Sequence, residues 1–346
     1  TVDQNGSPLY VLDPMALKNK AGQFKSIFSK LLPRTSFYYA MKSNNHPDVA
    51  KTMLASGFGL DVSSGVELTS ALALKAGDII FSGPGKTDEE LSLAMAHSDR
   101  VTLLLDSFGE LARLKDLVSE SPPAQPVRVG IRLTTNPAGL WRKFGIVPER
   151  LASFWNQVRE VPHIQFKGLQ FHSSWNLTPD RQLEFIDLLG ATLSRMPDQF
   201  NRAIEFIDIG GGYWPGEGEW LQFAGTEEGI RQRADGKDPV QERDHYRIPA
   251  TPIETFASTL FAAIKTHLFP WVNCRICFEP GRWICHSAMH LFLTVIDKKE
   301  DDLVITDAGT NAIGWERFEI DYFPVLNLSQ VGLKEKSCDI LGSLCT

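Results

Sequence analysis

The sequence predicts an α/β protein built from a (β/α)8 barrel and a smaller all-β domain. Between residues 37 and 279, eight apolar, strand-like runs alternate with amphipathic helical stretches. Strict alternation of strand and helix gives a parallel sheet, and eight such repeats are typical of a closed barrel. After residue 285 the apolar runs continue without helical stretches between them, which indicates a separate β domain. A doubly wound open sheet is the alternative, because periodicity does not report whether a sheet closes.

The barrel strands are expected at residues 37–41, 59–62, 78–82, 101–105, 127–133, 164–171, 204–209 and 274–278. Helices are expected near residues 46–56, 64–76, 87–97, 107–119, 148–160, 178–195 and 252–267. Thr178-Pro179 fits an N-cap followed by proline at the first helical position. Three other helix starts carry capping-box sequences directly after a strand, namely Ser64 with Glu67, Thr87 with Glu90, and Ser107 with Glu110.

We expect the barrel to span residues 14–284 and the β domain to combine residues 1–13 with 285–346. The apolar run 9–12 is a short strand that can join the later runs 289–295, 303–306 and 322–328 in a second sheet. Residues 213–250 form a long, charged segment rich in Gly and Pro after the seventh barrel strand. A loop of this length in a compact domain is usually a lid, an interface element or disorder.

Composition and charge favour a cytoplasmic protein that acts on small molecules. A chain of 346 residues with 43% hydrophobic residues can fill a large core. The net charge is −7 and the pI is about 5.7, which argues against nucleic acid or an anionic membrane as the main partner. The N-terminus lacks the pattern of a secretory signal, and no apolar stretch has the length of a membrane span.

The five cysteines all lie in the last quarter of the chain and are predicted to be reduced thiols. An odd set confined to one region is a poor disulfide framework. Cys274 and Cys277 have a Cys-x-x-Cys spacing, but they lie in a strand-like run, where an odd offset points side chains to opposite faces. We therefore predict no metal site.

Polar residues follow the predicted strands almost without exception, and in a barrel the C-terminal strand ends carry the reacting groups. Each of these residues alone has an ordinary structural explanation, such as a helix cap, a turn, an ion pair or a buried, hydrogen-bonded histidine. Together they describe a site for a phosphorylated aldehyde that carries a ring nitrogen. In chain order they are Lys42, Asp61, Ser82, Asp106, Arg132, His172, the run Gly210, Gly211 and Gly212, and Glu279 with Gly281 and Arg282.

Three of these features account for the chemistry of such a site. A lysine held against an apolar wall, as Lys42 is by the run 37–40, can lose its proton and form a Schiff base with an aldehyde cofactor. Glycines let backbone N–H groups close around a phosphate, and Arg282 adds a forked cation. A carboxylate such as Glu279 can hold a proton on a pyridine nitrogen, which then draws electrons from a carbanion and favours decarboxylation.

Seven motifs occur in order along the chain: Tyr39-Ala40-Met41-Lys42-Ser43-Asn44, Asp61-Val62-Ser63-Ser64-Gly65-Val66-Glu67-Leu68, Phe81-Ser82-Gly83-Pro84-Gly85-Lys86-Thr87, Gly168-Leu169-Gln170-Phe171-His172, Asp208-Ile209-Gly210-Gly211-Gly212, Glu279-Pro280-Gly281-Arg282 and Asp307-Ala308-Gly309. They resemble the pyridoxal-phosphate decarboxylases of fold type III, which include diaminopimelate, ornithine/arginine and carboxynorspermidine decarboxylases. The resemblance runs from about residue 8 to the last residue and is strongest to the diaminopimelate branch. It implies an alanine-racemase-like barrel.

The resemblance implies a role in binding pyridoxal 5'-phosphate for each matching residue. Lys42 forms the Schiff base, with Asp61 as the carboxylate near it. His172 stacks on the pyridine ring, whose nitrogen is held by Glu279. Arg132 is the basic residue under the far side of the cofactor. The phosphate is bound by Gly210, Gly211, Gly212, Gly281 and Arg282.

The resemblance also implies a shared active site. The segment Gly342-Ser343-Leu344-Cys345-Thr346 resembles the one whose cysteine reaches the partner subunit's site and protonates the product. Cys345 is therefore the expected acid, and a head-to-tail homodimer is the expected assembly. A buried apolar thiol is the structural alternative for Cys345. The C-terminus is expected to be incomplete, because relatives continue through further strands.

Two departures from the family pattern bear on the substrate. Ser173-Ser174-Trp175 stands where the family usually has Ile/Val-Gly-Ser, and the arginine expected after Asp307-Ala308-Gly309 is displaced by two positions, to Arg317. We expect an amino acid with a polar or charged tail, either diaminopimelate-like or a conjugate in a specialised pathway such as siderophore assembly. The alternatives are an amino-acid racemase on the same fold and a non-catalytic cofactor-binding regulator. Glu279 argues against the racemase, because racemases of this type usually place arginine at the ring nitrogen.

Overall fold

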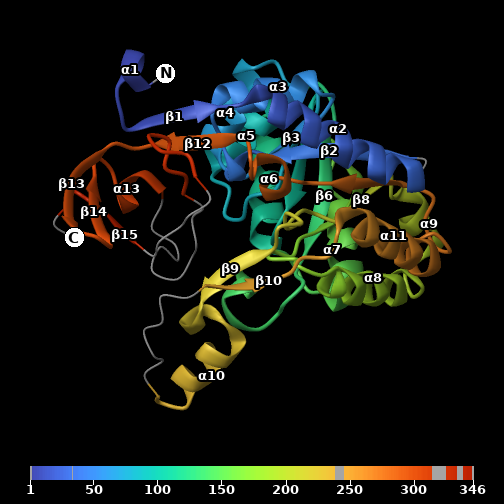
Figure 1. Ribbon diagram of the computed structural model, residues 1–346. Coiled ribbons are helices and arrows are strands. Elements are labelled where there is room, and N and C mark those ends of the chain that lie inside the picture. The colour runs from blue at the N-terminus through green and yellow to red at the C-terminus, as the bar shows by residue number, and fades with distance from the viewer. Residues whose placement is uncertain (1, 33, 238–244, 314–324, 333–337, 345–346) are drawn as a thin grey trace. The chain divides into compact units, whose positions relative to one another are not determined.

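The computed structural model describes residues 2–32, 34–237, 245–313, 325–332 and 338–344 (Figure 1). The chain divides into two compact units. The barrel unit comprises Pro14–Gly216 and Thr251–Ala288, and the second unit comprises Thr1–Asp13, Glu217–Ala250 and Met289–Thr346. The segment 217–250 thus groups with the second unit rather than with the expected span 14–284, because its two strands pair with each other and not with the barrel.

Eight parallel strands close into a barrel in the order β11-β2-β3-β4-β5-β6-β7-β8. The ring closes where β11 pairs with β2, through Ile276 opposite Thr35 and Phe278 opposite Phe37. The predicted closed barrel is confirmed, and this pairing excludes the open sheet, whose two edge strands would stay unpaired. The strands are β2 (Thr35–Ala40), β3 (Gly59–Val62), β4 (Ile79–Phe81), β5 (Val101–Leu105), β6 (Val127–Leu133), β7 (Ile164–Phe171), β8 (Phe206–Asp208) and β11 (Arg275–Phe278).

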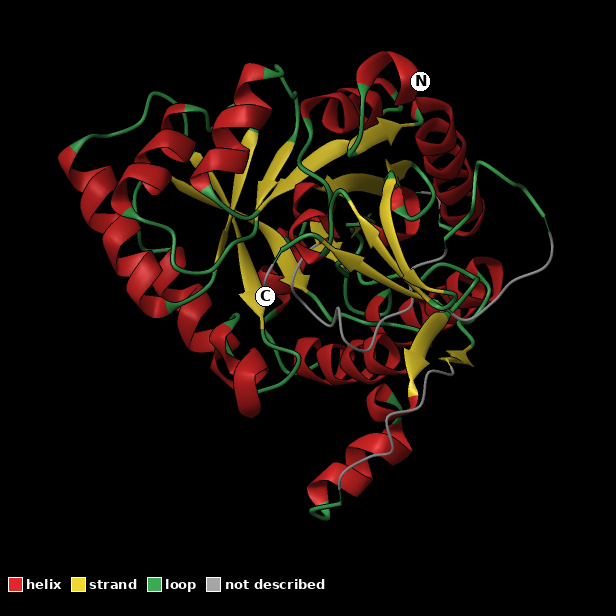
Figure 2. Ribbon diagram, turned by 60° about the vertical axis from the view of Figure 1, so that its left-hand side comes forward, coloured by secondary structure: helices red, strands yellow, loops and turns green. Residues whose placement is uncertain are grey.

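Helices lie outside this ring of strands (Figure 2). They bury stripes of apolar residues spaced three or four apart, as α2 does with Leu17, Ala21, Phe24 and Phe28. None of the described helices is long and apolar enough to cross a membrane. The helices of the barrel unit are α2 (Pro14–Leu31), α3 (Pro47–Ala55), α4 (Gly65–Ala73), α5 (Asp88–Ala96), α6 (Phe108–Glu120), α7 (Leu151–Val158), α8 (Asp180–Leu193), α9 (Asp198–Ala203), α11 (Ile253–Ala263) and α12 (Arg282–Cys285).

One of the three predicted capping boxes is complete. At α5 the Thr87 hydroxyl accepts from the Glu90 N–H, and the Glu90 carboxylate accepts from the Thr87 N–H. At α4 and α6 the serine hydroxyl caps the helix as predicted. The carboxylates do not complete the boxes, because Glu67 accepts from the Ser63 N–H and Glu110 accepts from the Lys86 ammonium. The prediction of an N-cap at Thr178 was wrong, because its hydroxyl donates to the Asp180 carboxylate and caps no backbone N–H of α8.

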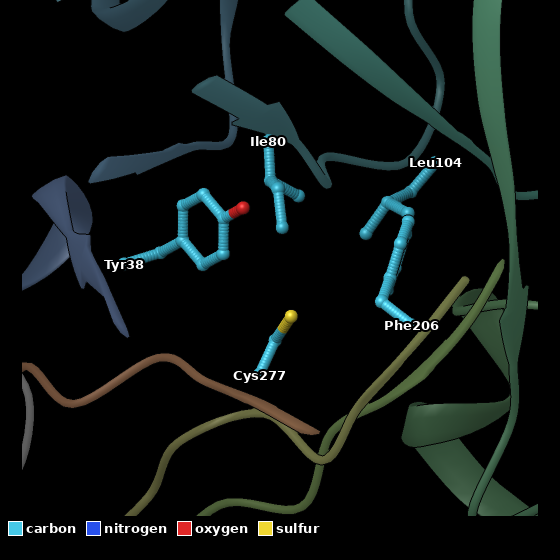
Figure 3. Packing of buried hydrophobic residues seen from close by; sticks show 5 residues of the cluster. All are labelled: Tyr38, Ile80, Leu104, Phe206 and Cys277. Carbon is cyan, nitrogen blue, oxygen red and sulfur yellow. The ribbon is translucent and has the colours of Figure 1, made fainter. Parts of the chain in front are cut away.

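The barrel interior is filled by side chains from strands on opposite sides of the ring. Figure 3 shows Tyr38, Ile80, Leu104, Phe206 and Cys277 pointing toward one another from five strands. None is more than 3% exposed. Inward-pointing layers of this kind make the barrel a packed core, which leaves the strand ends as the place for a site.

The described residues of the second unit form short elements. Strand β1 (Leu9–Leu12) pairs antiparallel with β12 (Met289–Phe292), which confirms that the N-terminal strand joins the C-terminal region. A three-stranded sheet joins β13 (Val295–Glu300), β14 (Leu303–Thr306) and β15 (Asp339–Gly342). The predicted strand over 322–328 is not formed by residues 325–328, so the prediction was wrong there. Residues 322–324 lie outside the described residues. The other elements are α1 (Val2–Asn5), β9 (Glu219–Gln222), α10 (Glu227–Ala234), β10 (His245–Ile248) and α13 (Thr310–Ile313).

A buried ion pair ties three elements of the barrel unit together. The Lys86 ammonium donates to the Glu110 carboxylate at 2.9 Å, to the Leu104 carbonyl at 2.8 Å and to the Gly83 carbonyl at 2.7 Å. Both charged side chains are 1% exposed. Burial lowers the pKa of Lys86, and the Glu110 charge opposes that shift. The pair therefore holds the loop after β4 against the end of β5 and the start of α6.

Replacing Lys86 by Met should destabilise the fold by about 3–5 kcal/mol, because Glu110 would remain as a buried charge without its cation. Urea unfolding measures the change in free energy. Lys51→Met is the matched control, since Lys51 pairs with Asp48 on the surface, with both side chains at least 60% exposed. Equal midpoints for the two variants would contradict the structural role of the buried pair.

Candidate active site

The C-terminal end of the barrel brings most of the predicted residues together. Lys42 follows β2 in a 3-10 turn, Met41–Ser43, and its ammonium lies 3.7 Å from the Asp61 carboxylate at the end of β3. The Lys42 side chain is 43% exposed, whereas that of Asp61 is 1% exposed. A reacting molecule can therefore reach the lysine while the carboxylate stays protected from water.

Asp61 is held from two sides. The Ser82 hydroxyl, just after β4, donates to one carboxylate oxygen, and the other faces Lys42. Burial raises the pKa of Asp61, and the charge of Glu279 raises it further, while the Lys42 cation opposes both. The ionisation of Asp61 therefore depends on the charges of both Lys42 and Glu279.

His172 is a neutral acceptor in this arrangement. The Gly211 N–H donates to its Nδ1 at 3.1 Å, which leaves the proton on Nε2, 3.2 Å from the Ser174 hydroxyl. Burial lowers the pKa of His172 well below its usual value, and the cations of Lys42 and Arg132 add to that shift. The imidazole is therefore fixed in one orientation and uncharged.

The glycine run after β8 passes too close to its neighbours for any side chain. A Cβ on Gly211 would lie 2.1 Å from the Glu279 carbonyl oxygen, and one on Gly212 would lie 2.3 Å from the Ser173 carbonyl oxygen. Gly210 and Gly212 also have φ of +71° and +80°, which side chains disfavour. The run is a bare backbone cradle of the kind that binds anions.

Glu279, at the end of β11, is buried beside this cradle. Its backbone N–H donates to the Gly210 carbonyl at 2.9 Å, and the Gln170 amide donates to its carboxylate at 3.4 Å. The Glu279 charge also acts on the buried Asp208 carboxyl and, with burial, raises its pKa. Within the described part of the chain, Glu279 Oε2 has no hydrogen-bond partner. His172 Nδ1 lies 3.5 Å from it but accepts from the Gly211 N–H and so has no proton to donate. A buried acceptor of this kind suits a ligand that brings its own N–H donor.

Arg132 and Arg282 come from different elements, β6 and α12. Arg132, at the end of β6, donates to the Ser82 carbonyl, and its Nε lies 3.9 Å from the Asp106 carboxylate. Arg282 begins α12, after Gly281, whose bare backbone lies against Ser43. Cys345, the predicted acid, lies outside the described residues.

Asp208 and Gln170 join the site although they were not among the predicted site residues. Both stand two residues before a predicted one, Gly210 and His172 respectively. Residues two apart along an extended chain share a face, so the spacing of Gln170 and His172 at the end of a predicted strand was the signal that could have found Gln170. The described cysteines, Cys274, Cys277, Cys285 and Cys338, are free thiols.

The chain matches the family model described as "Pyridoxal-dependent decarboxylase, pyridoxal binding domain" over residues 18–286. It is 25% identical to diaminopimelate decarboxylase of Methanothermobacter thermautotrophicus, over 99% of this chain and 76% of that protein. It is 29% identical to 2-[(L-alanin-3-ylcarbamoyl)methyl]-2-hydroxybutanedioate decarboxylase of Staphylococcus aureus, over 59% of this chain and 52% of that protein. The crystal structure of diaminopimelate decarboxylase from M. jannaschi matches with a TM-score of 0.79 and 21% identity, over 100% of this chain and 77% of that one.

The closed barrel with its polar strand ends therefore defines a pyridoxal-phosphate enzyme of the decarboxylase class. The chain belongs to the pyridoxal-dependent decarboxylase family, and it is a carboxy-lyase whose cofactor is pyridoxal phosphate. The residues fit that cofactor. Lys42 is an accessible amine, residues 210–212 form an anion cradle, and the Glu279 oxygen that accepts no hydrogen bond from the described residues suits a ring N–H.

Asp208→Asn should change how stability depends on pH. Burial and the Glu279 charge raise the pKa of Asp208 well above 3.8, so its ionisation destabilises the folded state as pH rises through the raised value. Asparagine keeps the acceptor for the Gly210 N–H, which lies at 2.8 Å, and cannot ionise. We expect the variant to gain stability over the native protein at about pH 8, with a difference that shrinks toward pH 4.

Urea unfolding of the cofactor-free protein across this pH range measures the effect. Asp116→Asn, on the exposed face of α6, is the control and should leave the profile unchanged. Parallel profiles for Asp208→Asn and the native protein would contradict the raised pKa.

Proposed function

We propose that the protein removes the α-carboxylate of an amino acid with a polar or charged tail. The substrate is either diaminopimelate-like or a conjugate of the kind assembled in specialised pathways such as siderophore synthesis. The names of the two relatives above, one a diaminopimelate decarboxylase and one acting on a substituted hydroxybutanedioate, support this range. Arg317, expected near the substrate's distal end, lies outside the described residues.

The buried carboxylate of Glu279 carries the proposal. When bound, pyridoxal phosphate supplies an electron-withdrawing ring that stabilises negative charge at the carbon that loses carbon dioxide. Glu279 would hold a proton on the ring nitrogen and so keep that withdrawal strong. Its position beside the anion cradle, with one oxygen that accepts no hydrogen bond from the described residues, supports this role. An arginine there would favour racemisation instead.

Lys42, Asp61 and His172 would orient the reacting end. Lys42 would bind the cofactor and give way to the substrate's amine, and its exposure supports access for that amine. Asp61 would steady the ammonium that forms on Lys42. His172 would offer a neutral ring face to the cofactor, because the Gly211 N–H fixes its orientation. Arg132 would lie on the cofactor's far side.

The phosphate would be bound by N–H groups of residues 210–212 and by Gly281 and Arg282. Two observations support this binding mode: the glycines leave no room for a Cβ, and Arg282 carries a positive charge. Cys345 would return a proton to the product from the partner subunit of a head-to-tail homodimer. The cytoplasm is the proposed location.

Lys42 should be the residue that bears the cofactor. Borohydride reduction of the loaded protein, followed by peptide mapping, should place a stable label on Lys42, because reduction fixes a lysine Schiff base irreversibly. Lys42→Arg should take up no label. A label on another lysine, or none on the native protein, would refute the assignment.

Carbon dioxide release from a panel of diamino acids and their conjugates tests the reaction. Glu279→Gln should lower kcat/KM by about 10²-fold or more, because the amide cannot hold the ring proton by charge. Glu205→Gln is the control, since Glu205 is 55% exposed and pairs with Lys167 at 2.7 Å. Racemised substrate without carbon dioxide would favour the racemase, and neither product would favour a cofactor-binding regulator.

A further inference from the structure

Two tryptophans of the barrel unit lie against the guanidinium of Arg282. The guanidinium carbon is 4.4 Å from the centroid of the Trp214 ring and 5.7 Å from that of Trp175. The two indoles are 6.4 Å apart, with their planes inclined by 30°. Both arginine contacts lie within the distance at which an aromatic ring attracts a cation.

One indole follows the anion cradle, residues 210–212, and the other lies in the loop after β7 that is hydrogen-bonded to it. Trp214 follows the glycine run by two residues and is 8% exposed. Trp175 follows His172 by three residues and has φ of +55°, a left-handed conformation that a bulky residue rarely adopts. A strained conformation persists only where its surroundings hold it.

Asn176 supplies that restraint. Its backbone N–H donates to the Gly212 carbonyl at 3.0 Å, and its side-chain amide donates to the Gly211 carbonyl at 3.0 Å. Asn176 is 2% exposed. The loop that carries Trp175 is therefore fixed to the glycine run itself, and the position of the indole follows the position of the cradle.

We propose that Trp175 and Trp214 are positioning residues that hold the Arg282 guanidinium at the phosphate cradle. This inference rests on the proposed phosphate role of Arg282. Arg282 is an exposed residue on a long, flexible side chain, which loses much rotamer freedom when it fixes an anion. Stacking on two indoles restricts the guanidinium in advance, so less freedom is lost on binding.

If Trp175 and Trp214 act through Arg282, they affect only the binding of the phosphate group. This distinguishes a positioning role from a general role in packing. Pyridoxal has the same aldehyde and ring as pyridoxal phosphate but no phosphate. If the tryptophans act through Arg282, their loss weakens the binding of pyridoxal phosphate and leaves the binding of pyridoxal unchanged. A packing defect would instead weaken the binding of both molecules.

The test is the ratio of dissociation constants for pyridoxal and pyridoxal phosphate, from absorbance titrations of the full chain stripped of cofactor. Trp214→Leu and Trp175→Leu should each lower the ratio about 2- to 30-fold, the range of a cation–π contact. Trp214→Phe should restore part of the loss, because it keeps a ring face. Trp175→Gly should lower the ratio without loss of stability, because glycine relieves the left-handed conformation.

Arg282→Met and a control complete the design. In the Arg282→Met background, Trp214→Leu should change the ratio no further, as expected of two residues that act through one contact. Trp271→Leu, at a tryptophan that is 44% exposed elsewhere on the barrel unit, should leave it unchanged. The positioning role is overturned if the tryptophan variants weaken the binding of pyridoxal and of pyridoxal phosphate equally. It is also overturned if Trp214→Leu lowers the ratio as much in the Arg282→Met background as in the native protein. If Arg282→Met itself leaves the ratio unchanged, the proposed phosphate role fails instead.

Discussion

The site depends on three carboxyl groups, those of Asp61, Asp208 and Glu279, buried together at one end of the barrel. Burial and like charge raise the pKa of Asp61 and of Asp208, so the cluster resists carrying its full negative charge. Donors from Ser82, Gly210 and Gln170 compensate part of that charge. The remaining negative charge can be matched by a cationic ligand group, as the proposed role of Glu279 at a protonated ring nitrogen requires.

Closure of the barrel puts the lysine and the glutamate of this site side by side. Lys42 follows the first strand of the ring and Glu279 follows the last, so an open sheet would place them at opposite edges. In the ring, β11 pairs with β2, and the Ala40 N–H donates to the Pro280 carbonyl at 3.3 Å. The charges of Lys42 and Glu279 accordingly both act on Asp61.

Rigidity on the other side of the site comes from two interlocked loops. The loop after β7 and the glycine run after β8 exchange hydrogen bonds in both directions, through His172, Asn176 and Gly211. Their close approach is possible only because the run lacks side chains. A cradle fixed in this way would lose little freedom on binding the phosphate proposed for it.

The sequence by itself determined the α/β class, the order of the strands along the chain and the residue types at their ends, whereas the pairing of β11 with β2 in the tertiary structure decided that the sheet closes. These follow from period, apolar runs and local capping signals, which are properties of neighbouring residues. Thr87 and Glu90 form the predicted box because both partners lie within one turn. Only the tertiary structure decided that Glu110 accepts from Lys86, that the charges of Asp208 and Glu279 act on each other, and that two tryptophans contact Arg282. Such contacts join residues far apart in the chain, and local pattern carries no information about which distant partner a side chain meets.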